Sequence, residues 1–119
     1  MKIAVTSTSP DLDSKVDPRF GRAAYILIVD PETLEFEAFD NRENANVLKG
    51  AGIQAAKMVS DKGAQVLLTG HCGPNAFKAL RAAKIGVANG AEGSVRDAVK
   101  AYRDGTLTLS DKPNVQGQW

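Results

Sequence analysis

The chain has 119 residues, of which 15 are lysine or arginine and 14 are aspartate or glutamate, so its formal net charge is +1. This length corresponds to a single domain, and the 43% share of hydrophobic residues is that of a folded globular protein. The near-neutral charge argues against a dedicated nucleic-acid-binding protein, which usually carries a strongly basic surface. A single cysteine excludes an internal disulfide and an all-cysteine zinc site within one chain.

No apolar run approaches the length of about 20 residues that a membrane-spanning helix requires. The N-terminal residues show no apolar signal core. We therefore expect a cytoplasmic protein that binds neither membranes nor nucleic acids.

The first half of the chain predicts three strands, interrupted by a long loop and a turn. Residues 3–5 form a short apolar run, and residues 7–22 lack any helical or strand period, which marks a long loop. Residues 24–29 are rich in β-branched and aromatic side chains, as strands are. Residues 30–33 have the composition of a turn, and residues 34–38 alternate apolar and polar side chains, so this region predicts an antiparallel hairpin.

The second half of the chain predicts helices that alternate with strands. Its elements are a helix over 46–62 that ends before Gly63, a strand over 65–69, a helix that begins at Pro74, a strand over 85–88, and a helix from Ser94 to Gly105. Ser94 and Asp97 have the spacing of a capping box at the start of the last helix.

These elements predict an α/β fold with a mixed five-stranded sheet and three flanking helices. Strands that are separated by helices run parallel, so the first, fourth and fifth strands form a parallel set and the hairpin adds one antiparallel strand. We expect one domain over residues 1–109 and a loose tail over residues 110–119.

The topology predicts where a ligand would bind. Ligands of open α/β sheets lie beyond the carboxyl ends of the parallel strands, where the strand order reverses. The loop of residues 7–22 leaves the first strand and residues 70–75 leave the fourth, so these two loops should face each other. The loop of residues 89–93, after the fifth strand, is a candidate for the same rim.

The turn of residues 70–75 contains the only histidine and the only cysteine of the chain, His71 and Cys72. It leads into a helix, whose first N–H groups and dipole attract anions and should lower the pKa of a cysteine. Thiolate and imidazole bind Cu(I), zinc and iron–sulfur clusters, so both residues are candidate metal ligands. The alternative is that Cys72 is a small core residue and that His71 bonds the backbone.

Arg19 and Arg22 flank a Phe–Gly pair in the long loop. Guanidinium groups bind phosphates, carboxylates or an anionic cluster through forked hydrogen bonds. In the alternative interpretation, both arginines are solvated or pair with Asp13 and Asp17, and the phenylalanine anchors the loop in the core.

Asp11, Asp13 and Asp17 lie in the same loop. Their spacing departs from the calcium-loop pattern and no glutamate completes it. We therefore expect these three side chains to be solvated.

Two motifs resemble those of a known family. Residues 17–23 (Asp-Pro-Arg-Phe-Gly-Arg-Ala) and residues 70–77 (Gly-His-Cys-Gly-Pro-Asn-Ala-Phe) resemble the hallmarks of the dinitrogenase iron–molybdenum cofactor biosynthesis family, in a resemblance that covers residues 1–107. The resemblance implies a ribonuclease-H-like fold. The family includes small carriers of nitrogenase cofactor or its precursors, and single-domain members of the orange-protein type, which hold a sulfide-bridged molybdenum–copper cluster without covalent attachment. Several carriers have a histidine where this chain has Arg19, so no metal-ligand role is implied for Arg19.

We therefore expect non-enzymatic binding or carriage of an anionic metal–sulfur cluster, of the iron–molybdenum precursor or molybdenum–copper sulfide type. The expected site comprises Arg19 and Arg22, the backbone N–H groups near Gly73, Asn75 and Ala76, and Cys72 or His71 as metal ligands. Proteins that donate or accept the cluster are the expected partners. Two alternatives stay open: a thiol-dependent enzyme with Cys72 as nucleophile and His71 as base, and a protein-interaction module without a ligand.

Overall fold

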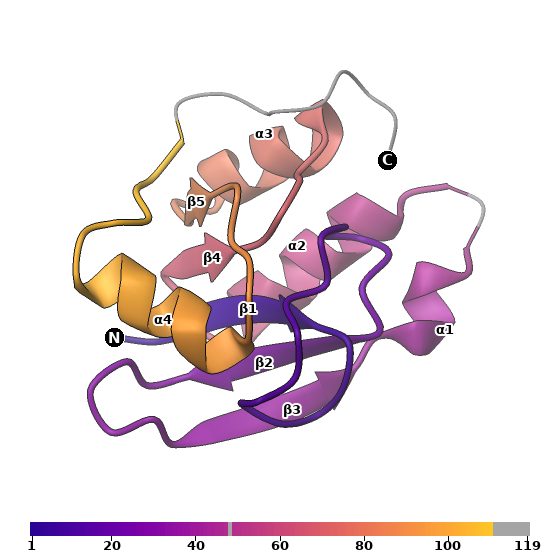
Figure 1. The fold of residues 1–119 in the computed structure, drawn as a ribbon. Coiled ribbons are helices and arrows are strands. Elements are labelled where there is room, and N and C mark those ends of the chain that lie inside the picture. Colours follow the sequence, from indigo (N-terminus) through magenta and orange to yellow (C-terminus); the bar gives the residue numbers. More distant parts are fainter. Residues whose placement is uncertain (48, 111–119) are drawn as a thin grey trace.

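The computed structural model describes residues 1–47 and 49–110, and this part of the chain forms one mixed sheet with helices on both faces (Figure 1). The elements are β1 (Ile3–Ser7), β2 (Tyr25–Val29), β3 (Phe36–Asp40), α1 (Arg42–Ala45), α2 (Ala51–Asp61), β4 (Val66–Leu68), α3 (Pro74–Ala82), β5 (Gly86–Ala88) and α4 (Val95–Arg103).

The sheet has five strands in the order β3-β2-β1-β4-β5. Strands β1, β4 and β5 run parallel, β2 runs antiparallel to β1, and β3 runs antiparallel to β2. β2 is therefore the one strand that opposes the other four. The predicted mixed five-stranded sheet with one antiparallel strand is confirmed, and β4 lies on the other side of β1 from the hairpin.

Alternate residues of the central strands supply two separate cores. Ala4, Leu67 and Val87 pack with α2 and α3 on one face of the sheet. Val5 and Leu68 pack with α4 on the opposite face. Figure 1 shows α4 across the sheet from α2 and α3. This three-layer arrangement leaves the carboxyl ends of β1 and β4 at the edge where the long loop and α3 begin.

The predicted helix over 46–62 is shorter than expected. Helix α2 begins at Ala51, after Gly50 adopts a left-handed φ of 77°. Leu48, which the prediction placed in this helix, lies outside the described residues. Two glycines, Gly50 and Gly52, weaken a helix in its interior by about 1 kcal/mol each relative to alanine, so a start after the first of them is favoured. A short fourth helix, α1, precedes this point and adds to the three that the sequence predicts.

The hairpin forms as expected, but its second strand starts later than predicted. Leu34 lies in the connecting loop with a φ of 64°, and its N–H donates to the carbonyl oxygen of Asp30 at 2.8 Å. Strand β3 therefore occupies residues 36–40 instead of 34–38.

The ends of the later helices follow their sequence signals. Pro74 is the first residue of α3, and Ser94 and Asp97 form the predicted capping box of α4. The N–H of Ser110 donates to the carbonyl oxygen of Val87 at 2.6 Å. The rest of the expected loose tail, residues 111–119, lies outside the described residues, so the domain boundary at residue 109 stays a prediction. Over residues 1–47 and 49–110, no helix has the length and apolar character needed to cross a membrane.

Candidate functional site

The two loops that the topology predicts to face each other are in direct contact. The N–H of His71 donates to the carbonyl oxygen of Pro18 at 2.6 Å, and the N–H of Phe20 donates to the carbonyl oxygen of His71 at 3.2 Å. A Cβ on Gly70 would lie only 2.7 Å from the Cα of Pro18. The close approach of the two loops therefore depends on the absence of a side chain at residue 70.

The start of α2 forms a third wall, which the sequence analysis missed. A Cβ on Gly21 would lie 2.5 Å from the backbone nitrogen of Gly52, and a Cβ on Gly52 would lie 2.9 Å from the Cβ of Ala76. The long loop, α2 and α3 thus meet at one three-way junction. The pair of glycines at residues 50 and 52 was the available signal, because glycine marks close approach of backbone segments.

A pocket with a volume of about 320 Å³ opens at this junction. Its lining residues are Phe20, Gly21, Arg22, Lys49, Gly50, Ala51, Gly52, Ile53, His71, Gly73, Asn75 and Ala76. Among these described residues two, Arg22 and Lys49, are basic and none is acidic. The pocket is therefore electropositive, and it contains five of the seven residues predicted for the site, Arg19 and Cys72 being the exceptions.

Two helices begin at the pocket, and neither is capped by a side chain. The residues before α2 and α3 are Gly50 and Gly73, and neither helix has an acidic residue in its first turn. Helix α4, which begins away from the pocket, has both a serine cap and an acidic first turn. The first N–H groups of a helix have no intrahelical partner and carry partial positive charge. The pocket thus combines two helix N-termini, an arrangement suited to an anion.

Arg22 stabilises one wall of the pocket through hydrogen bonds. Its Nη1 donates to the carbonyl oxygens of Ala45, at 2.8 Å, and of Val47. These bonds join the long loop to the segment between α1 and α2. They use one of the three guanidinium nitrogens, and no acidic partner appears among the described ion pairs of Arg22. The guanidinium charge is therefore not cancelled locally.

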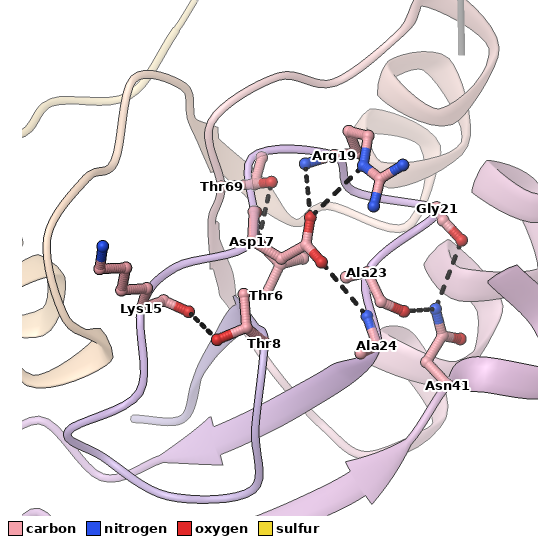
Figure 2. Close-up of polar contacts among 10 residues, drawn as sticks. All are labelled: Thr6, Thr8, Lys15, Asp17, Arg19, Gly21, Ala23, Ala24, Asn41 and Thr69. Carbon is pink, nitrogen blue, oxygen red and sulfur yellow. Dashed lines mark hydrogen bonds and ion pairs between the residues drawn. The ribbon is translucent and has the colours of Figure 1, made fainter.

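Arg19 behaves as the alternative interpretation proposed. Its Nε lies 3.6 Å from Oδ1 of Asp17, and its side chain is 48% exposed. It does not line the pocket, and Figure 2 shows it beside Asp17.

Asp17 is buried, so the expectation that it is solvated was wrong. Its Oδ1 accepts the N–H of Arg19 at 3.1 Å, and its Oδ2 accepts the N–H of Ala24 at 3.4 Å (Figure 2). The Oγ1 of Thr6 donates to its carbonyl oxygen at 2.7 Å. The carboxylate thus joins both ends of the segment that carries Phe20 to Arg22, and the backbone of Asp17 anchors this segment to β1. Over residues 1–47 and 49–110, no group of three or more histidine, cysteine or acidic residues is arranged to hold a metal ion.

Two asparagines at the start of α1 and within it also position the pocket, and no sequence motif marks them. Asn41 donates from Nδ2 to the carbonyl oxygens of Gly21, at 3.3 Å, and Ala23, at 2.8 Å. Asn44 donates from Nδ2 to the carbonyl oxygen of Ala51 at 3.0 Å. They tie the long loop and the start of α2 to the same short helix.

His71 lines the pocket, whereas Cys72 lies in the core between the sheet and α3. The Cys72 side chain is wholly inaccessible, and burial raises the pKa of its thiol to about 12. The predicted lowering of this pKa is wrong, because loss of hydration outweighs the field of the helix start. The loop of residues 89–93 is absent from the lining residues in the described part of the chain, although the N–H of Gly90 supports the site by donating to the carbonyl oxygen of Gly70 at 2.9 Å.

Comparison with known proteins places this fold and site in a family. The family model described as Dinitrogenase iron-molybdenum cofactor matches residues 1–105. The apo form of the orange protein from Desulfovibrio gigas has a TM-score of 0.92 and 47% identity, with 96% of each chain covered. A provisional NifB protein from Thermotoga, of the DUF35 family, has a TM-score of 0.79 and 32% identity, with 91% of each chain covered.

A provisional dinitrogenase from Methanocaldococcus jannaschii shares the fold at a TM-score of 0.70 and 18% identity, with 95% of this chain and 97% of that chain covered. The comparison with curated proteins gave no match. The family model spans nearly the whole described chain, including both motifs and all three walls of the pocket. The chain therefore belongs to the dinitrogenase iron–molybdenum cofactor family.

Proposed function

We propose that the protein binds an anionic metal–sulfur cluster non-covalently in this pocket, and that it carries the cluster without catalysing a reaction. The observation that supports the proposal is the convergence of two uncapped helix N-termini on a pocket with Arg22 and Lys49 and without an acid among its lining residues. The family description and the similarity to an orange protein agree with such a cargo.

The chemistry of the walls favours a sulfide-rich anion over a hydrated metal cation. A cation would be repelled by the guanidinium, the ammonium and the helix starts. Phe20, Ile53 and Ala76 supply apolar surface between these polar groups. Sulfur is a weak hydrogen-bond acceptor, so a sulfide surface loses less hydration free energy than an oxyanion does when it contacts apolar side chains.

The protein's own thiol does not enter the proposed site. Cys72 is buried as a protonated thiol, so the sulfur must arrive with the cluster. His71 lines the pocket, and imidazole is a ligand for copper and iron. We propose His71 as the one side chain that touches a metal of the cluster, which is of the molybdenum–copper or iron–molybdenum type.

The two alternatives have less support. A thiol-dependent enzyme needs an accessible thiolate, and Cys72 is neither accessible nor readily ionised. A module without a ligand would have no need of an open electropositive pocket. Proteins that donate or accept the cluster remain the proposed partners.

The proposal is tested by adding molybdate, copper and sulfide to the protein without oxygen, followed by gel filtration. We expect visible charge-transfer absorption to elute with the protein and elemental analysis to find the metals. Asn75→Asp adds a carboxylate to the first turn of α3, inside the pocket. It should weaken cluster binding about tenfold, although an acid at a helix start favours the helix itself.

Gln65→Glu is the matched control, because Gln65 is exposed and lies just before β4, at the other end of the sheet. It should leave cluster binding unchanged. A colourless protein, or equal loss of binding in both variants, would contradict the proposal.

A further inference from the structure

The charges of this nearly neutral protein are unevenly distributed along its chain. Residues 44–91, which include α2 and α3, contain six lysines and arginines and one aspartate. The rest of the chain contains 13 acidic residues and nine basic ones. The net charge of +1 therefore conceals a basic segment, which contains α2 and α3, in a chain whose other residues are acidic in sum.

The six basic side chains are all exposed, and we call the surface that they form the basic face. Its residues are Lys49, Lys57, Lys62, Lys78, Arg81 and Lys84. The ion pairs between described residues join Arg19 to Asp17, Arg42 to Asp40 and Arg96 to Asp13, so none includes a lysine of this face. Asp61, which lies beside Lys57 and Lys62, is the one acidic residue among residues 44–91, so the positive charges of this face outnumber the negative ones.

Part of the basic face lies at the mouth of the pocket, around the apolar side chain of Ile53. Lys49 and Ile53 line the pocket, and the Ile53 side chain is 50% exposed. Lys57 lies one turn beyond Ile53 on α2, and Lys78 lies one turn beyond Asn75 on α3. An apolar centre within a charged rim is the anatomy of a protein–protein interface.

We infer that the basic face is the docking surface for a partner protein whose contact surface is acidic. The reason for a partner to dock beside the pocket rests on the proposed function, because a cluster can pass between two proteins only where the pocket opens. Charge complementarity would accelerate the encounter and select the partner. A contact with other copies of this chain fits less well, because two basic faces repel each other and so disfavour the symmetric contact of a two-fold dimer.

A nucleic acid is also less suited to this surface. Single-stranded nucleic acids are held by exposed aromatic rings and by arginine. Here the ring of Phe39 is covered by the Lys62 ammonium at 4.4 Å, and the ring of Phe77 is covered by the Arg81 guanidinium at 5.5 Å. Five of the six cations are lysines.

The test uses NMR titration of the isotope-labelled protein with a glutamate-rich peptide that contains a central leucine. An oligonucleotide of the same total charge is titrated in parallel at the same ionic strength. We expect the peptide to shift the amide resonances of α2 and α3. The double variant Lys57→Glu/Lys78→Glu should bind the peptide about tenfold more weakly. Lys2→Glu/Lys100→Glu, which makes the same charge change outside the basic face, should bind as the wild type does.

Three results would overturn the inference: tighter binding of the oligonucleotide than of the peptide, equal peptide affinity in the two double variants, and self-association of the unliganded protein through α2 and α3. The inference fails separately from the proposed function. Lys57 and Lys78 do not line the pocket, so their double variant should still retain the coloured cluster. Peptide binding without cluster binding would support the docking surface and contradict the proposed function.

Discussion

Cys72 illustrates how burial decides the chemistry of a single residue. It stands next to the start of α3, where the helix field contributes on the order of 1 kcal/mol in favour of a negative charge. Its side chain is nevertheless enclosed by the core, where a thiolate would lose its hydration. The sequence shows that Cys72 precedes a helix but does not show that its side chain is buried. This is why the sequence predicted a reactive thiol.

Because Cys72 is buried, the stability of the protein should vary with pH in the alkaline range. Burial raises the pKa of Cys72 from 9.0 to about 12, so between these values the unfolded chain loses its thiol proton and the folded protein keeps it. The free energy of unfolding should therefore fall as the pH rises from 9.0 to about 12. Cys72→Ala should abolish that part of the pH dependence in urea titrations, while it leaves cluster binding intact. Loss of the cluster in folded Cys72→Ala would show that the thiol is a ligand after all.

The site residues could be predicted only in part. Arg22, His71 and the start of α3 were found because their motifs are local in sequence. Lys49 and the start of α2 were missed, because their place in the pocket depends on contacts with Gly21 and Ala76. Arg19 was predicted for the site and instead pairs with Asp17, since nothing local distinguishes the two arginines.

At the scale of elements, the order and direction of the strands were predictable because they follow from hydrophobic runs and connection rules. Pro74 and the capping box of α4 were predictable because each signal acts within one helical turn. The start of α2 was placed too early, although Gly50 and Gly52 were a local signal for it. Gly50 stops the helix through its left-handed backbone, and nothing lies within 4 Å of the place where its side chain would be.

The contact between α2 and α3 should be sensitive to a single methyl group. Gly52→Ala improves helix propensity, but its Cβ would lie 2.9 Å from the Cβ of Ala76. We expect a loss of about 1–3 kcal/mol in unfolding free energy from overpacking, together with weaker cluster binding. Gly52→Ala/Ala76→Gly moves the methyl group across the contact and should restore both. Denaturant unfolding and the visible absorption of bound cluster measure the two effects, and a stabilised single variant would show that the helices are free to separate.

At the scale of the whole molecule, the charges that line the pocket should make cargo binding depend on ionic strength. Arg22 and Lys49 line the pocket without an acidic residue among its lining residues. Added salt screens exposed charges over roughly 10 Å at 0.1 M, so cluster affinity should fall as salt rises. Affinity measured at several salt concentrations checks this expectation. An affinity that does not change with salt would mean that helix N–H groups and apolar contact hold the cargo without help from Arg22 and Lys49.

The absence of side-chain caps on α2 and α3 has a consequence for the binding of an anion. A side-chain cap stabilises a helix start by about 1 kcal/mol, and both helices lack one. An anion in the pocket would satisfy the N–H groups that a serine or aspartate satisfies elsewhere. The cargo would then act as the shared cap of two helices, so that loading the protein and completing its secondary structure become the same event.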